Sequence, residues 1–204
     1  RAKKSLGQHF LANSDYCQKI AQFAQIGPED TVVEIGPGTG QLTRFLLPLA
    51  RKVIAVELDR DLVRYLNEHF LKETEAAKHL DVIQADILSF DWAAVGNKPF
   101  KVIGNLPYGI ATQILQNMLP IKNRLQSGTF LLQKEVAQRM LSSSNSGDYG
   151  YFTLLMEYHF DRAAGFDVPP GAFVPPPKVV SQAIQLKPRN SPFRVPDEPG
   201  FQTL

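Results

Sequence analysis

The tetrapeptide Asn105-Leu106-Pro107-Tyr108 has side chains that suit recognition of a planar base carrying an exocyclic amine. The Asn105 side-chain carbonyl and a backbone carbonyl near Leu106 can each accept one N–H of such an amine. Pro107 restricts the backbone, so this carbonyl stays in place, and the Tyr108 ring offers a face for stacking. Two accepted N–H groups favour a more tetrahedral nitrogen whose lone pair points at an electrophile. The tetrapeptide therefore predicts group transfer to a base nitrogen.

A glycine-rich segment nearer the N-terminus predicts the site of a nucleoside cofactor. Gly36, Gly38 and Gly40 follow an apolar run, and glycines let the backbone pass close to a ligand. Position 42 is leucine, so the spacing departs from the dinucleotide pattern Gly-x-Gly-x-x-Gly. An uncharged linker with an amino-acid tail, as in S-adenosylmethionine, therefore suits the loop better than the pyrophosphate of NAD, which is the second candidate.

Two carboxylates end the next two predicted strands. Glu57 follows the apolar run 52–56 and can accept hydrogen bonds from both hydroxyls of a ribose. Asp86 follows the run 82–85 and can accept an adenine amine, with Ile87 beside the ring. A sulfonium is already a strong electrophile and needs no strong general base. Together these residues predict methyl transfer from S-adenosylmethionine to a nucleobase nitrogen.

Strands alternate with helices along most of the chain, which is typical of an α/β fold with a parallel sheet covered on both faces. The expected strands are 31–35, 52–56, 82–85, 100–104, 129–132 and 179–186. The expected helices follow a cap at 13–15 and lie near 42–49, 59–70, 110–119 and 134–141. The apolar run 151–158 fits either a helix or a strand. The carboxyl ends of parallel strands meet at one edge, so the motifs above are expected to lie together.

A proline-dense segment, 168–177, predicts a stiff, extended loop. We expect this loop to present Phe173 opposite Tyr108, so that two rings enclose an extruded base. The alternative is that Phe173 packs over the edge of the sheet. Lys178 follows the prolines and either contacts a phosphate or is a solvated surface lysine.

Composition excludes several other classes of protein. The 204 residues are 44% hydrophobic and 21% charged, with a net charge of +2, as in ordinary globular proteins. The single cysteine, Cys17, excludes an internal disulfide, and the four scattered histidines show no metal-ligand spacing, so no metal is expected. No apolar run approaches the roughly 20 residues that span a bilayer, and no signal-peptide pattern is present. These features predict a cytoplasmic protein without a membrane partner.

Three cations lie in the first four residues, at Arg1, Lys3 and Lys4. We expect residues 1–12 to form a basic, flexible arm that contacts RNA phosphates. A solvated terminus is the alternative.

Seven motifs, in order, resemble the bacterial ribosomal RNA small subunit dimethyladenosine transferases, the KsgA family. The motifs occupy 5–11, 34–40, 56–59, 84–86, 105–108, 133–137 and 173–179. The resemblance implies a Rossmann-like class I S-adenosylmethionine-dependent methyltransferase: a seven-stranded, mostly parallel sheet with helices on both faces. Its reversed last hairpin would come from residues near 158–167 and 179–187. It also implies N6,N6-dimethylation of two adjacent adenosines near the 3′ end of 16S rRNA, in the immature small subunit. A monomer is expected.

The same resemblance assigns roles to individual residues. The residues that would close over or hold the cofactor, and later its product S-adenosylhomocysteine, are Gln8, His9, Leu11, Gly36, Gly38, Gly40, Glu57, Leu58, Asp86, Ile87 and Asn105. The residues that would handle the target base are Asn105, Leu106, Pro107, Tyr108 and Phe173. Family members often carry asparagine at the position of His9.

The resemblance also implies domain limits and alternatives. Residues 1–187 would form the catalytic domain, and 188–204 a linker or the start of a helical domain. One alternative is an Erm-type enzyme acting on 23S rRNA, although that group usually has isoleucine at the position of Leu106. The other is a non-catalytic factor that binds the immature small subunit during assembly.

Overall fold

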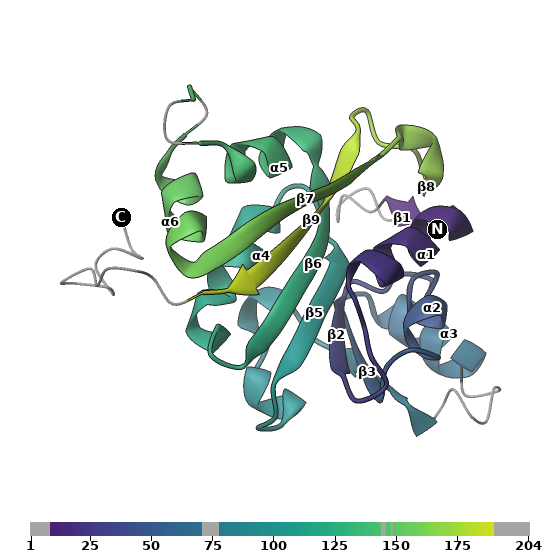
Figure 1. Ribbon diagram of the computed structural model, residues 1–204. Helices are drawn as coiled ribbons and strands as arrows, with labels where there is room; N and C mark the ends of the chain where they lie inside the picture. Colours follow the sequence, from purple (N-terminus) through teal and green to yellow (C-terminus); the bar gives the residue numbers. More distant parts are fainter. Residues whose placement is uncertain (1–8, 71–77, 144–145, 148, 190–204) are drawn as a thin grey trace.

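The computed structural model describes residues 9–70, 78–143, 146–147 and 149–189 (Figure 1). Several predicted features lie outside the described residues: Arg1, Lys3, Lys4, Gln8 and the segment 190–204. The predictions made for them stay predictions.

One seven-stranded sheet, in the order β4-β3-β2-β5-β6-β9-β7, forms the centre of the molecule. Its strands are β2 (Thr31–Ile35), β3 (Lys52–Glu57), β4 (Leu80–Gln84), β5 (Phe100–Asn105), β6 (Leu125–Gln133), β7 (Phe160–Val168) and β9 (Ser181–Pro188). Strand β9 runs antiparallel to both β6 and β7, while β2 to β6 pair in parallel. The predicted mostly parallel sheet with a reversed last hairpin is confirmed.

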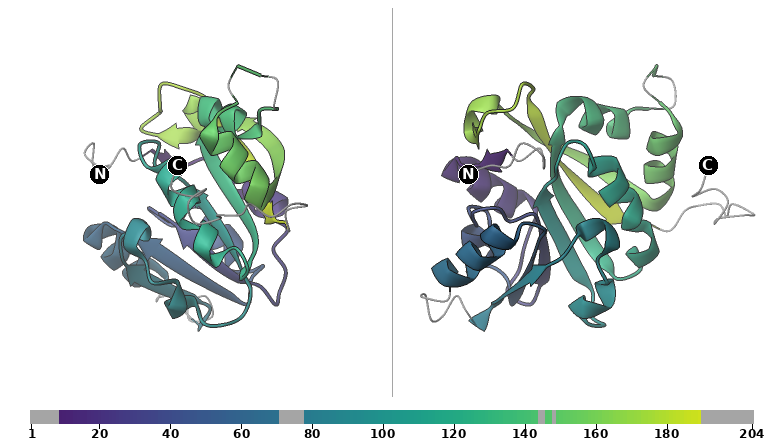
Figure 2. Two further views of the ribbon diagram at one scale, coloured as in Figure 1. Left: turned by 90° about the vertical axis from the view of Figure 1, so that its left-hand side faces the viewer. Right: turned by 180° about the vertical axis from the view of Figure 1, so that it is seen from behind.

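Helices cover both faces of the sheet, which explains why the central strands are apolar on both sides. One face packs against α4 (Ala111–Asn117), α5 (Lys134–Leu141) and α6 (Tyr151–His159). The other packs against α1 (Ser14–Phe23) and α2 (Thr43–Leu46). Helix α3 (Arg60–Phe70) lies beside α2 and contacts β3 and β4 (Figures 1 and 2). The ambiguous run 151–158 is therefore helical.

Two connections are shorter or less regular than the sequence predicts. Helix α2 is a single turn instead of spanning 42–49, because Pro48 has no N–H to continue the helical hydrogen bonds. Between β4 and β5 the chain forms two 3-10 helices, η3 (Ile87–Ser89) and η4 (Trp92–Val95). The side chain of Asp86 accepts a hydrogen bond from Leu88 N and caps η3. Further 3-10 turns are η5 (Leu119–Ile121) and η6 (Pro170–Ala172).

A second, two-stranded sheet ties the N-terminal segment to the proline-rich loop. Strand β1 (Phe10–Leu11) pairs antiparallel with β8 (Phe173–Val174), and the two lie together near one end of the central sheet (Figure 1). Ala12 N donates to Ala172 O at 2.8 Å. Residues 9–12 thus differ from the expected flexible arm, because these backbone hydrogen bonds hold them against residues 172–174.

Candidate active site

A cavity of about 340 Å³ opens at the carboxyl edge of the sheet. Its volume falls within the roughly 300–1,000 Å³ typical of small-molecule sites. Its walls come from the N-terminal segment, the ends of β2, β3 and β5, and the loop after β4. The lining residues are His9, Phe10, Ile35, Gly36, Val56, Glu57, Leu58, Ala85, Asp86, Ile87 and the run 105–110. One cavity therefore contains the glycine-loop side of the site and the Asn105–Tyr108 tetrapeptide, as expected for strand ends that meet at one edge.

The three loop glycines all have positive φ, yet they serve different purposes. Gly36 lines the cavity, has φ +63°, and no atom of the residues that the structure describes lies within 4 Å of the position that a Cβ would take. A Cβ on Gly38 would lie 2.6 Å from the Phe10 ring, and one on Gly40 2.6 Å from the Phe70 ring. Gly36 thus leaves space for a guest, while Gly38 and Gly40 permit close packing of the loop.

Glu57 is held in place by the loop that it faces. Its Oε2 accepts from Gly38 N at 3.1 Å and its Oε1 accepts from Asp59 N at 2.9 Å. Burial raises the pKa of Glu57, while these hydrogen bonds act in the opposite direction. Each carboxylate oxygen can still accept a second hydrogen bond. The carboxylate is thus pre-oriented as an acceptor for a pair of hydroxyls.

The adjoining wall offers apolar surface and one further carboxylate. Leu58 is 49% exposed although it lines the cavity, and Ile87 lines it as well. Asp86 also lines the cavity, and its Oδ1 accepts from Leu88 N at 2.9 Å. The combination suits a flat heterocycle with an amine at its edge.

Asn105 ends β5 with its two polar atoms in different surroundings. Its Nδ2 donates to the backbone carbonyl of His9 at 2.8 Å. Its Oδ1 is buried and has no hydrogen-bond partner within the described residues. An unpaired buried acceptor costs about 1–3 kcal/mol, and such a group calls for an explanation. Because Asn105 lines the cavity, this oxygen is a candidate acceptor for an N–H of a guest.

The rest of the tetrapeptide is held rigidly. Leu106 is buried, and its N–H donates to Leu131 O at 3.1 Å, while Ile110 N donates to Pro107 O at 3.2 Å. The Tyr108 hydroxyl lies 2.7 Å from Ser181 Oγ, and burial raises the pKa of Tyr108. The Tyr108 ring stacks on the His9 ring, with centroids 5.6 Å apart and planes at 26°.

Phe173 differs from its expected position opposite Tyr108. Its side chain is 2% exposed, belongs to a core cluster and does not line the cavity. The reason is the alternation of β8, which turns Phe173 inward and leaves Val174 61% exposed. Leu11, its partner in β1, is buried in the same cluster and does not line the cavity either. The ring that does contact Tyr108 is that of His9.

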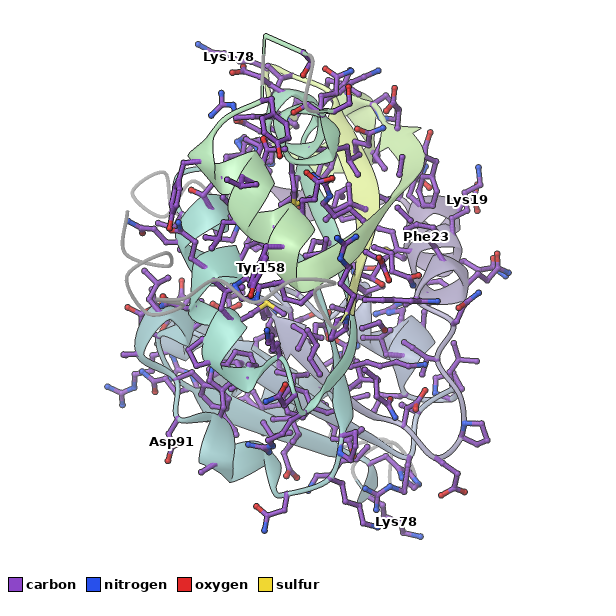
Figure 3. The ribbon with its side chains drawn as sticks, turned by 60° about the vertical axis from the view of Figure 1, so that its left-hand side comes forward. Lys19, Phe23, Lys78, Asp91, Tyr158 and Lys178 are labelled. Carbon is purple, nitrogen blue, oxygen red and sulfur yellow. The ribbon has the colours of Figure 1, made fainter. Side chains whose placement is uncertain are left out.

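Lys178 is exposed and lies at one end of the molecule, far from Lys78 and Asp91 at the other end (Figure 3). Its contact with a phosphate stays a prediction. Within the described ranges, no group of three or more His, Cys, Asp or Glu residues could hold a metal ion. In the same part of the chain, no helix combines the length and the apolar character needed to cross a membrane.

Two polar residues that support the site were missed from the sequence. Glu34 is buried beneath the glycine loop and accepts a hydrogen bond from Thr43 Oγ1 at 2.6 Å. Burial raises the pKa of Glu34 to about 7. The signal was an acid inside an otherwise apolar strand, two residues before Gly36. The other is Ser181, the first residue of β9, whose hydroxyl contacts that of Tyr108.

The profile of the Ribosomal RNA adenine dimethylase family matches residues 1–204. The chain belongs to this family. It is 40% identical over 188 residues to the Ribosomal RNA small subunit methyltransferase A of Aromatoleum aromaticum, covering 92% of this chain and 69% of that one. It is 41% identical over 192 residues to the protein of the same description from Francisella tularensis, covering 94% and 72%. The resemblance inferred from the seven motifs is confirmed.

Solved structures of the family's fold agree with this assignment. A dimethyladenosine transferase from Plasmodium falciparum superposes with a TM-score of 0.81 at 30% identity, over 89% of this chain and 64% of that one. The 23S rRNA methyltransferase ErmE superposes with a TM-score of 0.79 at 28% identity, over 95% and 76%. All four of these relatives are longer than the region that they share with this chain.

Proposed function

We propose that the chain is an S-adenosylmethionine-dependent rRNA adenine N6-dimethyltransferase that acts on small-subunit rRNA. The observation that carries the proposal is Asn105, whose buried Oδ1 has no partner among the described residues, in the wall of a cavity that Gly36 and Glu57 also line. Methyl transfer to an amine requires both an acceptor that binds the amine and a binding site for the nucleoside cofactor.

The residues present fit S-adenosylmethionine. The open space beside Gly36 would admit the linker and amino-acid tail, and the Glu57 carboxylate would accept the ribose hydroxyls. Leu58 and Ile87 would hold the adenine, and Asp86 would accept a hydrogen bond from its amine. When bound, the cofactor supplies an electrophilic methyl group on a sulfonium sulfur and leaves as S-adenosylhomocysteine.

The chain's own residues then position the target adenine. The base leaves its stack and lies on the Tyr108 ring, a contact worth about 1–3 kcal/mol. Asn105 Oδ1 and the Leu106 carbonyl accept the two N–H groups of the exocyclic amine, which directs the nitrogen lone pair toward the methyl donor. The rigid Pro107 turn keeps both acceptors in place. The displaced proton leaves to water.

The finer assignments follow from the family. We assign the target to two adjacent adenosines near the 3′ end of 16S rRNA in the immature small subunit, modified by a cytoplasmic monomer. Identity of 40–41% to curated small-subunit enzymes supports this choice. Gln8 keeps its proposed cofactor role, and Arg1, Lys3, Lys4 and Lys178 keep their proposed RNA contacts. Residues 1–187 are proposed as the catalytic domain, with 188–204 leading toward a helical domain.

A methylation assay on two substrates tests the proposal. The protein is incubated with S-adenosylmethionine and undermethylated small subunits, or with large subunits lacking adenine dimethylation, and digested RNA is analysed by mass spectrometry. We expect dimethyladenosine at two neighbouring positions of 16S rRNA and none in 23S rRNA. Modification of a single adenine in 23S rRNA would instead support the Erm-type alternative. Absence of methylation in both would contradict the proposed activity.

A further inference from the structure

We propose that His9 is a positioning residue for methyl transfer. Its backbone carbonyl orients the Asn105 amide, and its imidazole holds that carbonyl in place. This inference rests on the proposed function, because it concerns the acceptor that receives the target amine.

The His9 carbonyl sets the direction of the Asn105 amide. A carbonyl oxygen can only accept hydrogen bonds, so the end of the amide that faces His9 O must be the NH2 group. The Nδ2···O distance is 2.8 Å. Because Nδ2 donates to His9 O, Oδ1 has to be at the other end of the planar amide, where it is buried and no described residue partners it. The His9 carbonyl therefore decides which atom of Asn105 meets a base amine.

Contacts of the His9 side chain and of the strand that follows hold the His9 carbonyl in place. His9 Nδ1 lies 2.8 Å from Pro175 O, and since that carbonyl only accepts, Nδ1 carries the proton and donates. The imidazole also stacks on Tyr108. On the C-terminal side, Phe10 and Leu11 pair with Val174 and Phe173. His9 is thus held by its side chain as well as by the strand that follows it.

The hydrogen bond between Asn105 and the His9 carbonyl should affect the rate of methyl transfer. The two-residue strand β1 lies between both halves of the site, since the Phe10 ring packs against Gly38 while the His9 carbonyl binds Asn105. Transfer to a base nitrogen depends on alignment, and a misplacement of about 1 Å can cost roughly 100-fold in rate. Loosening His9 lets the amide turn, so the acceptor is no longer presented.

The chemistry of the side chain identifies a conservative variant. Histidine Nδ1 and asparagine Nδ2 are both nitrogen donors bonded to Cγ. His9→Asn therefore keeps a donor for Pro175 O and removes only the ring. His9→Ala removes both. The matched control is His79→Ala, because His79 is an exposed histidine whose Nδ1 lies 2.9 Å from Arg51 O, before β4 at the other edge of the sheet.

The test combines kinetics with two readouts on the protein itself. Methyl incorporation into undermethylated small subunits gives kcat and KM, and calorimetric titration with S-adenosylhomocysteine gives the cofactor-site Kd. The side-chain 15N–1H signals of Asn105, assigned by their loss in Asn105→Asp, report its hydrogen bond. Circular dichroism confirms that each variant folds.

For His9→Ala we expect kcat to fall roughly 10- to 100-fold, with the Kd for S-adenosylhomocysteine within threefold of the parent's. The Asn105 amide signals shift and exchange faster with solvent. His9→Asn recovers most of kcat and the parental amide signals, and His79→Ala matches the parent in every readout.

Two results would overturn the inference. One is a loss in His9→Ala that falls wholly on cofactor Kd with kcat unchanged, which makes His9 a cofactor ligand only. The other is an Asn105 amide signal that does not respond to His9→Ala. If the parent methylates no adenine, the proposed function fails by itself, and the amide signals still decide whether His9 orients Asn105.

Discussion

The two halves of the cavity are built in opposite ways. The cofactor half comes from two short stretches that follow the pattern of strand and loop, residues 34–59 and 85–87, and its carboxylate Glu57 has a backbone donor on each oxygen. The base half is assembled from residues far apart, including His9, Asn105 and Ser181, and among the described residues Asn105 Oδ1 has no partner. The cofactor half is therefore a preformed receptor. In the base half, we expect the substrate amine to supply the hydrogen bond that Asn105 Oδ1 accepts.

The largest effect is expected from removing the Asn105 side chain, which should impair the base half far more than the cofactor half. Asn105→Ala should lower methyl incorporation into undermethylated small subunits about 10²–10³-fold, the usual effect of deleting one preorganised polar group. The affinity for S-adenosylhomocysteine should fall by about tenfold or less, since one hydrogen bond at most is lost. Parallel sedimentation assays should show subunit binding unchanged. A variant that methylates normally would show that transfer does not need the Asn105 side chain and would contradict the role assigned to it.

The second prediction concerns the pH dependence of stability that Glu34, next to the cofactor half, should cause. The pKa of Glu34 is raised by burial from 4.5 to about 7, so between these values the folded chain holds a proton that the unfolded chain releases. Stability from this group is present below pH 4.5 and is lost as pH rises to about 7. Glu34→Gln keeps an acceptor for Thr43 and removes the titration.

The variant should therefore gain roughly 3 kcal/mol relative to the parent on going from pH 4.5 to pH 8. Urea unfolding at both pH values measures this difference. Parallel pH profiles of the two proteins would show that the pKa of Glu34 is the same in the folded and unfolded chains and would contradict the raised pKa.

The third effect tests the open space beside Gly36. Gly36→Ala places a Cβ in the cavity at φ +63°, so we expect cofactor-site affinity to fall by roughly 10- to 50-fold. Gly96→Ala is the matched control, because Gly96 also has positive φ (+87°) and open space around it but does not line the cavity. Both should lose about 1–3 kcal/mol of stability through strain. Equal affinity in the two variants would show that the guest lies elsewhere.

The smallest effect refines the base half. Tyr108→Phe retains the stacking ring and removes the hydroxyl contact with Ser181. We expect a loss of about 0.5–1.5 kcal/mol in unfolding free energy and a change in KM for the subunit of less than threefold. Thermal unfolding and steady-state assays check these values. A rate loss as large as that of Asn105→Ala would give the hydroxyl a chemical role that this account does not include.

The same contrast explains what could be predicted from the sequence. Gly36 and Glu57 follow apolar runs, and strand ends in a parallel sheet meet at one edge, so the cofactor half follows from local pattern. The pairing of β1 with β8 joins residues more than 160 positions apart, and two-residue strands carry no periodicity. Phe173 was therefore placed at the base site, whereas its side chain is buried and the ring beside Tyr108 belongs to His9.

The direction of the Asn105 amide was beyond prediction for the same reason. The residue type of Asn105 and its position after an apolar strand indicated an acceptor for an amine. Which end of the amide is left to accept an N–H depends on the carbonyl of His9, which no local pattern near position 105 reveals. Glu34 was missed although an acid within an apolar strand was a visible signal.

The most direct measurement of the central claim is a crystal structure of the protein with S-adenosylhomocysteine and an adenosine-containing oligonucleotide. The account predicts the purine on the Tyr108 ring, with its exocyclic nitrogen about 2.7–3.2 Å from Asn105 Oδ1 and the cofactor product along Gly36 and Glu57. A purine bound away from Tyr108, with Asn105 Oδ1 still lacking a partner, would contradict it.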